Sequence, residues 1–138
     1  MAPKIEKPIT GEVAFPVYYE DTDFSGYVYH ANYLKYFERA REHAIGMKNL
    51  RDLFANGFQY VVRHADVRYR APTGHGDTII IKTEATITDS PRIIFHQQAL
   101  SKNNATVLVE GKLEVVCIKA ESGKPAHMPA AMVALFGG

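Results

Sequence analysis

The chain has 138 residues, the length of one domain, and its formal net charge of +1 gives no electrostatic reason to expect binding to nucleic acid or to a membrane surface. Hydrophobic residues make up 46% of the chain and charged residues 22%, an ordinary balance for a soluble globular protein. No apolar run approaches the roughly 20 residues that a membrane-spanning helix needs, and the polar residues 1–8 lack the apolar core of a signal peptide.

The first half of the chain predicts an arm, a strand and two helices. Residues 1–12 contain two prolines and a glycine, and we expect a flexible N-terminal arm there. The apolar residues 13–20 predict the first strand. Apolar side chains then recur at helical spacing over residues 31–46, where Gly46 ends the helix. A short second helix follows over residues 49–57, with Asn49 as its cap and Gly57 as its end.

From Phe58 onward the hydrophobic period changes from helical to two. Ala65, Val67 and Tyr69 alternate with polar residues, which predicts a strand with one buried and one wet face. Further strands are expected over residues 78–88, 92–101 and 105–119, and a short helix over residues 129–136. One long helix followed by strands with short connections predicts an α+β fold, with an antiparallel sheet folded onto the helix. Residues 13–138 would then form a single domain.

Cysteine and histidine spacing indicates neither disulfides nor metal. Cys117 is the only cysteine, so no disulfide and no thiolate cluster can form within the chain. The absence of disulfides suits the cytoplasm. The histidines show no metal-ligand spacing with each other or with acidic residues. We therefore expect a cytoplasmic protein that holds neither a metal nor a cofactor.

The stretch between the first strand and the long helix concentrates the reactive side chains. Asp21, Asp23 and His30 lie within ten residues of each other. Acids at a strand end are typical of a turn, but Tyr27 and Tyr33 make the neighbourhood too apolar for a fully solvated loop. A carboxylate held near a helix N-terminus can act as a nucleophile or as a general base. These residues alone leave open which of the two acids would do so.

A longer motif runs through the same stretch. It reads Val17-Tyr18-Tyr19-Glu20-Asp21-Thr22-Asp23, followed by Gly26, Val28-Tyr29-His30 and Tyr33. This motif resembles the active-site signature of the 4-hydroxybenzoyl-CoA thioesterase family. It is most similar to the branch of small bacterial acyl-CoA thioesterases encoded beside the Tol-Pal envelope genes. Residues 36–41, 61–63, 69–72 and 129–136 also resemble that branch. The resemblance implies a hot-dog fold, in which an antiparallel sheet wraps around one long helix.

The resemblance also implies roles for individual residues. Asp23 would be the catalytic acid, as nucleophile or as general base on water, and Asp21 would cap the turn. His30 would supply its main-chain N–H to the developing oxyanion, as free N–H groups at a helix start can. Gly26 would permit a tight turn. Gly26, Tyr29, Tyr33 and Arg92 are the expected substrate-binding residues. Tyr27 stands where the signature more often has a small aliphatic residue, so it either reshapes the acyl pocket or lies in the core.

These observations predict an acyl-CoA thioesterase that hydrolyses a short-to-medium acyl or aromatic CoA thioester, with coenzyme A as part of the substrate. Thioesters of acyl carrier protein are an alternative substrate. One rival function is a hot-dog hydratase or dehydratase, which uses a histidine with a distant acid. Another is a non-catalytic acyl-CoA-binding module. Retention of Asp23 favours the thioesterase over both rivals.

A homo-oligomer is expected as well. One helix cannot cover both faces of a sheet, and the face away from the helix is expected to carry apolar residues. They are Ile80, Ile94, Leu100, Leu108 and Val116. We therefore expect at least a dimer, and the resemblance implies a dimer or a tetramer.

Overall fold

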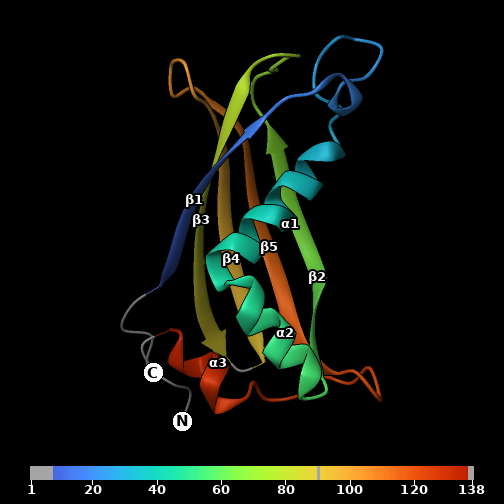
Figure 1. The fold of residues 1–138 in the computed structure, drawn as a ribbon, viewed down its shortest axis with the longest axis vertical. Helices are drawn as coiled ribbons and strands as arrows, with labels where there is room; N and C mark the ends of the chain where they lie inside the picture. Colours follow the sequence, from blue (N-terminus) through green and yellow to red (C-terminus); the bar gives the residue numbers. More distant parts are fainter. Residues whose placement is uncertain (1–7, 90, 137–138) are drawn as a thin grey trace.

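The computed structural model of the protein describes residues 8–89 and 91–136, which form a curved antiparallel sheet with one long helix packed against it (Figure 1). The strand order is β1-β3-β4-β5-β2. The strands are β1 (Ile9–Pro16), β2 (Phe58–Tyr69), β3 (Thr78–Asp89), β4 (Arg92–Ser101) and β5 (Val107–Lys119). The helices are α1 (Asn32–Ile45), α2 (Met47–Ala55) and α3 (Ala130–Ala134), with a 3-10 turn, η1, at Tyr19–Asp21. The predicted α+β class and the sheet wrapped on a helix are confirmed.

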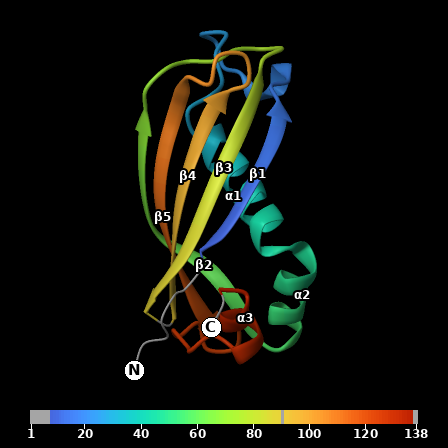
Figure 2. The ribbon, with the colours of Figure 1, turned by 90° about the vertical axis from the view of Figure 1, so that its left-hand side faces the viewer.

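The core lies between α1 and the middle of the sheet, and Figure 2 shows the helix on one side of the curved strands. Strand β3 alternates as predicted. Its inward-facing side chains are all buried, and they are Ile79, Ile81, Thr83, Ala85 and Ile87. From the helix, Tyr36, Phe37 and Ala40 meet this layer. Helix α1 packs mainly on β1 and β3, and α2 packs on β2.

Helix α1 comes close to the sheet at Gly111 on β5. A Cβ atom at this position would lie 2.9 Å from Cε2 of Phe37 and 3.1 Å from Cδ1 of Leu113. Contacts that short are not tolerated without movement of the neighbours. Gly111 therefore sets how deeply the Phe37 ring can sit on the sheet.

Strand β1 begins earlier than the sequence predicted. Residues 9–12, which were expected in the arm, pair with β3 in the register Ile9↔Ala85 to Glu12↔Lys82. The boundary of the arm at residue 12 is therefore wrong, and residues 1–7 lie outside the described residues. The physical reason is Gly11, where an added Cβ would lie 3.1 Å from Cβ of Ala44. In the sequence Gly11 is typical of a loop, but in the structure it lies in β1 and lets the strand pass close to α1.

The second helix also starts differently. It begins at Met47, directly after Gly46. The φ of +97° at Gly46 ends α1 and changes the direction of the chain before α2. Asn49 is not its cap, because this residue lies inside the helix and its side chain donates to the carbonyl of Ile45 at 2.7 Å. Gly57, with a φ of +88°, follows the helix end as expected.

Strand β2 does not have the buried face that its alternation predicted. It lies at the edge of the sheet, where α1 covers it only in part. Val62 is 50% exposed and Tyr69 is 48% exposed, although both point to the helix side of the sheet. The apolar surface left open by one chain therefore lies along the β2 edge.

The face of the sheet away from α1 differs from the expected apolar patch. Leu100, Leu108 and Val116 are buried within the chain itself. Leu108 falls at the irregularity where the β4–β5 register shifts, and such a bulge re-aims a side chain. The same face carries two cross-strand ion pairs, Arg70–Glu110 and Arg92–Glu114. This face is therefore more polar than the sequence suggested.

No helix within residues 8–89 and 91–136 has the length and apolar character needed to cross a membrane.

The contact between α1 and β5 can be tested by Gly111→Ala. The new methyl group would overlap the Phe37 ring, and we expect a loss of about 1–3 kcal/mol in the free energy of unfolding. In a Phe37→Leu background, which removes the ring atoms concerned, the same substitution should cost less. Denaturant unfolding of the four proteins measures this coupling. A Gly111→Ala variant as stable as the wild type would contradict the packing described.

Candidate active site

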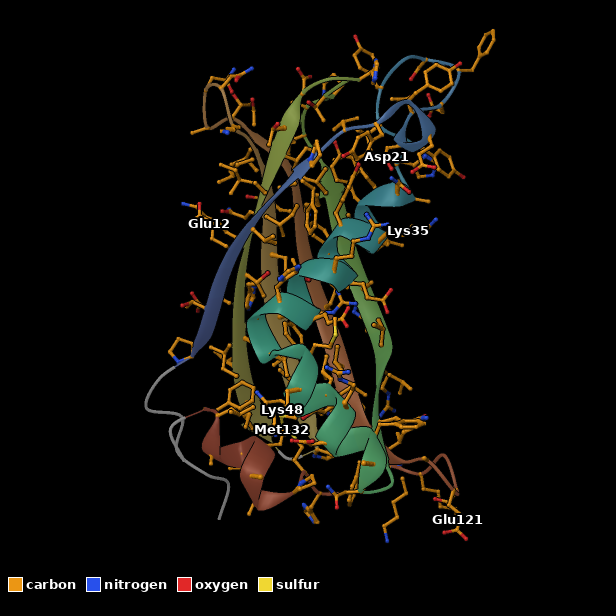
Figure 3. All side chains as sticks on the ribbon, in the orientation of Figure 1. Glu12, Asp21, Lys35, Lys48, Glu121 and Met132 are labelled. Atoms are coloured by element: carbon orange, nitrogen blue, oxygen red, sulfur yellow. The ribbon has the colours of Figure 1, made fainter. Side chains whose placement is uncertain are left out.

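The connection from β1 to α1 folds back on itself at one end of the molecule, where Figure 3 shows Asp21 beside the first turn of the helix. The Asp21 carboxylate accepts hydrogen bonds from the Tyr18 N–H at 2.9 Å and from Nδ2 of Asn32 at 3.0 Å. Partial burial opposes ionisation, but these hydrogen bonds prevail and lower the pKa of Asp21 below its ordinary value. Asp21 therefore ties η1 to α1, in keeping with a structural, turn-capping role.

Asp23 begins a tight turn that ends near Tyr27. The Gly26 N–H donates to the Asp23 carbonyl at 3.0 Å, and the Asp23 N–H donates to the Tyr27 carbonyl at 3.0 Å. Gly26 has a φ of +85°, a conformation that residues with a Cβ rarely adopt. The expected need for glycine at this position is confirmed.

The Asp23 side chain is exposed and held in its ionised form. Its Oδ1 accepts hydrogen bonds from the hydroxyl of Ser25 and from the Ser25 N–H, the latter at 2.8 Å. These two bonds lower the pKa of Asp23 below its ordinary value. A carboxylate in this state can attack a carbonyl carbon or accept a proton from water.

The start of α1 offers free hydrogen-bond donors. The Asn32 N–H donates to the Tyr29 carbonyl at 2.8 Å, which closes the turn before the helix. Within residues 8–89 and 91–136, the main-chain N–H groups of His30 and Ala31 have no acceptor. Two adjacent free N–H groups at a helix N-terminus are suited to bind an anion or a developing oxyanion.

Aromatic side chains surround these donors. The His30 ring lies 4.7 Å from the Tyr29 ring and 5.9 Å from the Tyr69 ring, measured between centroids. Tyr33 is buried and contacts Tyr69 at 6.0 Å. Burial, with a smaller effect of Tyr69, raises the pKa of Tyr33 to about 12, so its phenol stays neutral.

Four of the six predicted site residues thus occur in the connection from β1 to α1, namely Asp23, Gly26, Tyr29 and His30, and a fifth, Tyr33, lies in the first turn of α1. The structure adds Tyr69, whose hydroxyl donates to the His30 carbonyl at 2.8 Å. Sequence alone indicated only that Tyr69 lies on a strand, within the matching segment 69–72. Tyr27 is half-exposed and pairs with Gly74 in an isolated antiparallel β-bridge. Of the two alternatives for Tyr27, a position in the core is therefore wrong.

Arg92 does not join the other five within one chain. Strand β3 runs for 12 residues from Thr78, beside the end of β1, to Asp89, which pairs with Arg92. A strand of that length spans roughly 35 Å, so Arg92 lies at the opposite end of the sheet. Its guanidinium pairs with Glu114 at 3.3 Å. The predicted role of Arg92 in this site therefore requires a second chain.

Two cavities differ in their chemistry. One of about 440 Å³ lies between α1, α2 and β2 and is lined mainly by apolar side chains. They include Ile45, Leu53, Phe58, Tyr60, Val62 and Phe95. The other, of about 720 Å³, is lined mostly by polar and charged residues from all five strands, among them Lys82, Glu84 and Lys112. Only the first has the apolar lining that is typical of a site for an acyl group.

No group of three or more histidine, cysteine, aspartate or glutamate side chains that could hold a metal ion occurs in the described part of the chain.

Comparison with known proteins agrees with the motif. Residues 17–136 match the family described as the thioesterase-like superfamily. The chain is 38% identical over 122 residues to the acyl-CoA thioester hydrolase YbgC of Escherichia coli, across 87% of this chain and 90% of that protein. It is 32% identical over 128 residues to the acyl-CoA thioesterase YbgC of Haemophilus influenzae, across 89% of this chain and 93% of that protein.

A solved thioesterase structure has the same fold as this chain. The 1,4-dihydroxy-2-naphthoyl-CoA thioesterase from Synechocystis superposes with a TM-score of 0.85 over 93% of this chain and 96% of that chain, at 24% sequence identity. At this identity the likeness concerns the fold alone. Because the family match extends over residues 17–136 and the two YbgC proteins align over most of their length, the resemblance found in the motif is confirmed. The chain belongs to the thioesterase-like superfamily.

Proposed function

We propose that this protein hydrolyses a short-to-medium acyl or aromatic CoA thioester to the free acid and CoA. The observation that supports this most strongly is the pair of unpaired N–H groups of His30 and Ala31, in the same connection as the ionised Asp23. A thioester hydrolase needs both features, namely a donor pair for the carbonyl oxygen and a nucleophile or base for the carbonyl carbon.

The proposed reaction begins with the thioester oxygen at the start of α1. Hydrogen bonds from the two N–H groups stabilise the negative charge that develops on this oxygen. In one form of the mechanism Asp23 accepts a proton from water as the new carbon–oxygen bond forms. In the other, the Asp23 carboxylate attacks the carbonyl carbon directly, and water hydrolyses the resulting anhydride. In both forms the carbon–sulfur bond breaks, and CoA leaves as a thiolate that takes up a proton.

This reaction requires no metal and no cofactor, because coenzyme A is part of the substrate. Acyl carrier protein presents the same thioester chemistry and is the alternative source of substrate. The apolar cavity between α1, α2 and β2 supports an acyl chain of medium length. Glu38 lines this cavity and lies six residues after Asn32, the first residue of α1. This part of the cavity wall is therefore about 9 Å along the helix axis from the start of α1. The buried, unpaired Cys117 supports a cytoplasmic location.

We also propose that the active protein is a homo-oligomer, a dimer or a tetramer. In the described part of the sheet, β2 has β5 as its one neighbour, and its exposed edge is 12 residues long. An open edge of this length with exposed apolar side chains favours pairing with another strand. A second chain along β2 would cover Val62 and Tyr69. In one chain Val62, Tyr69 and the Asp23 side chain are all exposed.

The two acids provide the first test of the mechanism. Asp23→Asn removes the reactive carboxylate, and we expect kcat to fall by about 10²–10⁴ with little change in KM. Asp21→Asn is the matched control, because it removes one negative charge two residues away. It should keep much more activity and lose about 1 kcal/mol of stability, as expected for a turn or helix cap. Steady-state kinetics on short, medium and aromatic acyl-CoAs, with acyl carrier protein thioesters included, measure both variants. Loss of activity in Asp21→Asn but not in Asp23→Asn would show that the acids are assigned the wrong way round.

The oxyanion site can be tested at His30. His30→Ala keeps the main-chain N–H and should keep measurable activity. Proline has no N–H, so His30→Pro should lower kcat by about 10²–10³, the usual effect of losing one oxyanion donor. Circular dichroism must show that both variants are folded. Equal losses in the two folded variants would assign the role to the imidazole ring instead.

The oligomer can be tested by sedimentation velocity at micromolar concentration. We expect a dimer or a tetramer for the wild type. Val62→Lys places a charge on the open side of β2 and should shift the distribution towards the monomer, because a buried unpaired charge is costly. A wild-type sample that sediments only as a monomer would contradict this proposal.

A further inference from the structure

Two peptide groups carry the free N–H donors at the start of α1, and the carbonyl oxygen of each peptide accepts a hydrogen bond. In a trans peptide the carbonyl and the N–H point in opposite directions, so a hydrogen bond that fixes the carbonyl also fixes the direction of the N–H. The Tyr29 carbonyl, which belongs to the same peptide as the His30 N–H, accepts from the Asn32 N–H at 2.8 Å. This first donor is therefore oriented by the main chain.

The second donor is oriented by a side chain. The His30 carbonyl belongs to the same peptide as the Ala31 N–H. It accepts from the Tyr69 hydroxyl at 2.8 Å, whereas its main-chain hydrogen bond from the Tyr33 N–H is long, at 3.4 Å. Without the hydroxyl, this carbonyl would be free to turn towards the Tyr33 N–H. The Ala31 N–H would turn with it.

Tyr69 is itself held in place. It is the last residue of β2 and pairs with Val109 of β5, so the sheet fixes its main chain. Its ring meets the His30 ring at an interplanar angle of 87° and the Tyr33 ring at 66°. Burial raises the pKa of the Tyr69 phenol above its ordinary value. The phenol is therefore protonated at neutral pH and able to donate.

We propose that Tyr69 is a positioning residue for thioester hydrolysis, whose hydroxyl holds the His30–Ala31 peptide so that the Ala31 N–H becomes the second donor to the oxyanion. This inference rests on the proposed function. Tyr69 acts through the peptide and does not touch the reacting atoms. The hydrogen bond to the carbonyl also polarises the same peptide, and chains of this kind strengthen each hydrogen bond by about 10–30%.

Tyr69→Phe tests the proposal, because it removes the hydroxyl and keeps the ring contacts with His30 and Tyr33. We expect kcat to fall by about 3- to 10-fold, the size of one lost hydrogen bond, with KM unchanged. Ser122→Ala is the control, since it removes a hydroxyl group from an exposed loop outside the candidate site. The control should leave kcat unchanged. An unchanged kcat in Tyr69→Phe, or a rise in KM alone, would overturn the proposal.

Infrared spectroscopy separates a failure of this inference from a failure of the proposed function. In the Asp23→Asn variant, a bound acyl-CoA labelled with ¹³C at the thioester carbon should show a carbonyl stretch at lower frequency than in water, because the N–H donors polarise the bond. Adding Tyr69→Phe should reverse part of that shift. The absence of any shift in Asp23→Asn would contradict the oxyanion site itself. An equal shift with and without Tyr69→Phe would leave that site in place and overturn the role of Tyr69.

Discussion

The close packing of α1 on the sheet is the constraint on which the rest of the molecule depends. Gln97 on β4 is only 1% exposed, and its amide donates to the Phe37 carbonyl at 2.9 Å and to the Thr83 hydroxyl at 3.0 Å. Nη1 of Arg41 donates to the side-chain oxygen of Gln97, Oε1, at 3.1 Å. Because buried polar groups must be paired, these bonds favour one rotation of the helix. Gly111 then sets how closely the Phe37 ring of the helix can approach the sheet.

That placement determines where the candidate site can form. The start of α1 lies at the end of the sheet where β1 stops, and the chain must fold back over a short distance to reach it. Asp21 joins the returning chain to Asn32, and Gly26 permits the turn that carries Asp23. The same placement leaves β2 only partly covered by α1. The β2 edge is therefore open because a single helix is too narrow for a five-stranded sheet.

Local patterns predicted much of this structure. The alternation of isoleucines on β3 and the helical spacing of α1 are short-range signals, and both elements are where the sequence placed them. The turn between Asp23 and Gly26 is local too, because a positive φ favours glycine. The motif from Val17 to Tyr33 covers this turn and the helix start, so the family resemblance that it carries was enough to indicate most of the candidate site.

Other features depend on contacts between distant segments. Tyr69 meets the carbonyl of a residue 39 positions earlier, and only the sheet register brings them together. The early start of β1 depends on how Gly11 meets Ala44 on α1, and the burial of Leu108 depends on a bulge. The position of Arg92 also depends on the sheet, because the length of β3 separates it from the turn at Asp23 within one chain.

The central claim is that the thioester oxygen binds the free N–H groups at the start of α1. A crystal structure of the Asp23→Asn variant with an intact acyl-CoA tests it most directly. The account predicts the thioester oxygen about 2.7–3.1 Å from the main-chain nitrogens of His30 and Ala31, with the carbonyl carbon facing residue 23. A thioester bound elsewhere, or with its oxygen turned towards solvent while both N–H groups remain free, would contradict the claim.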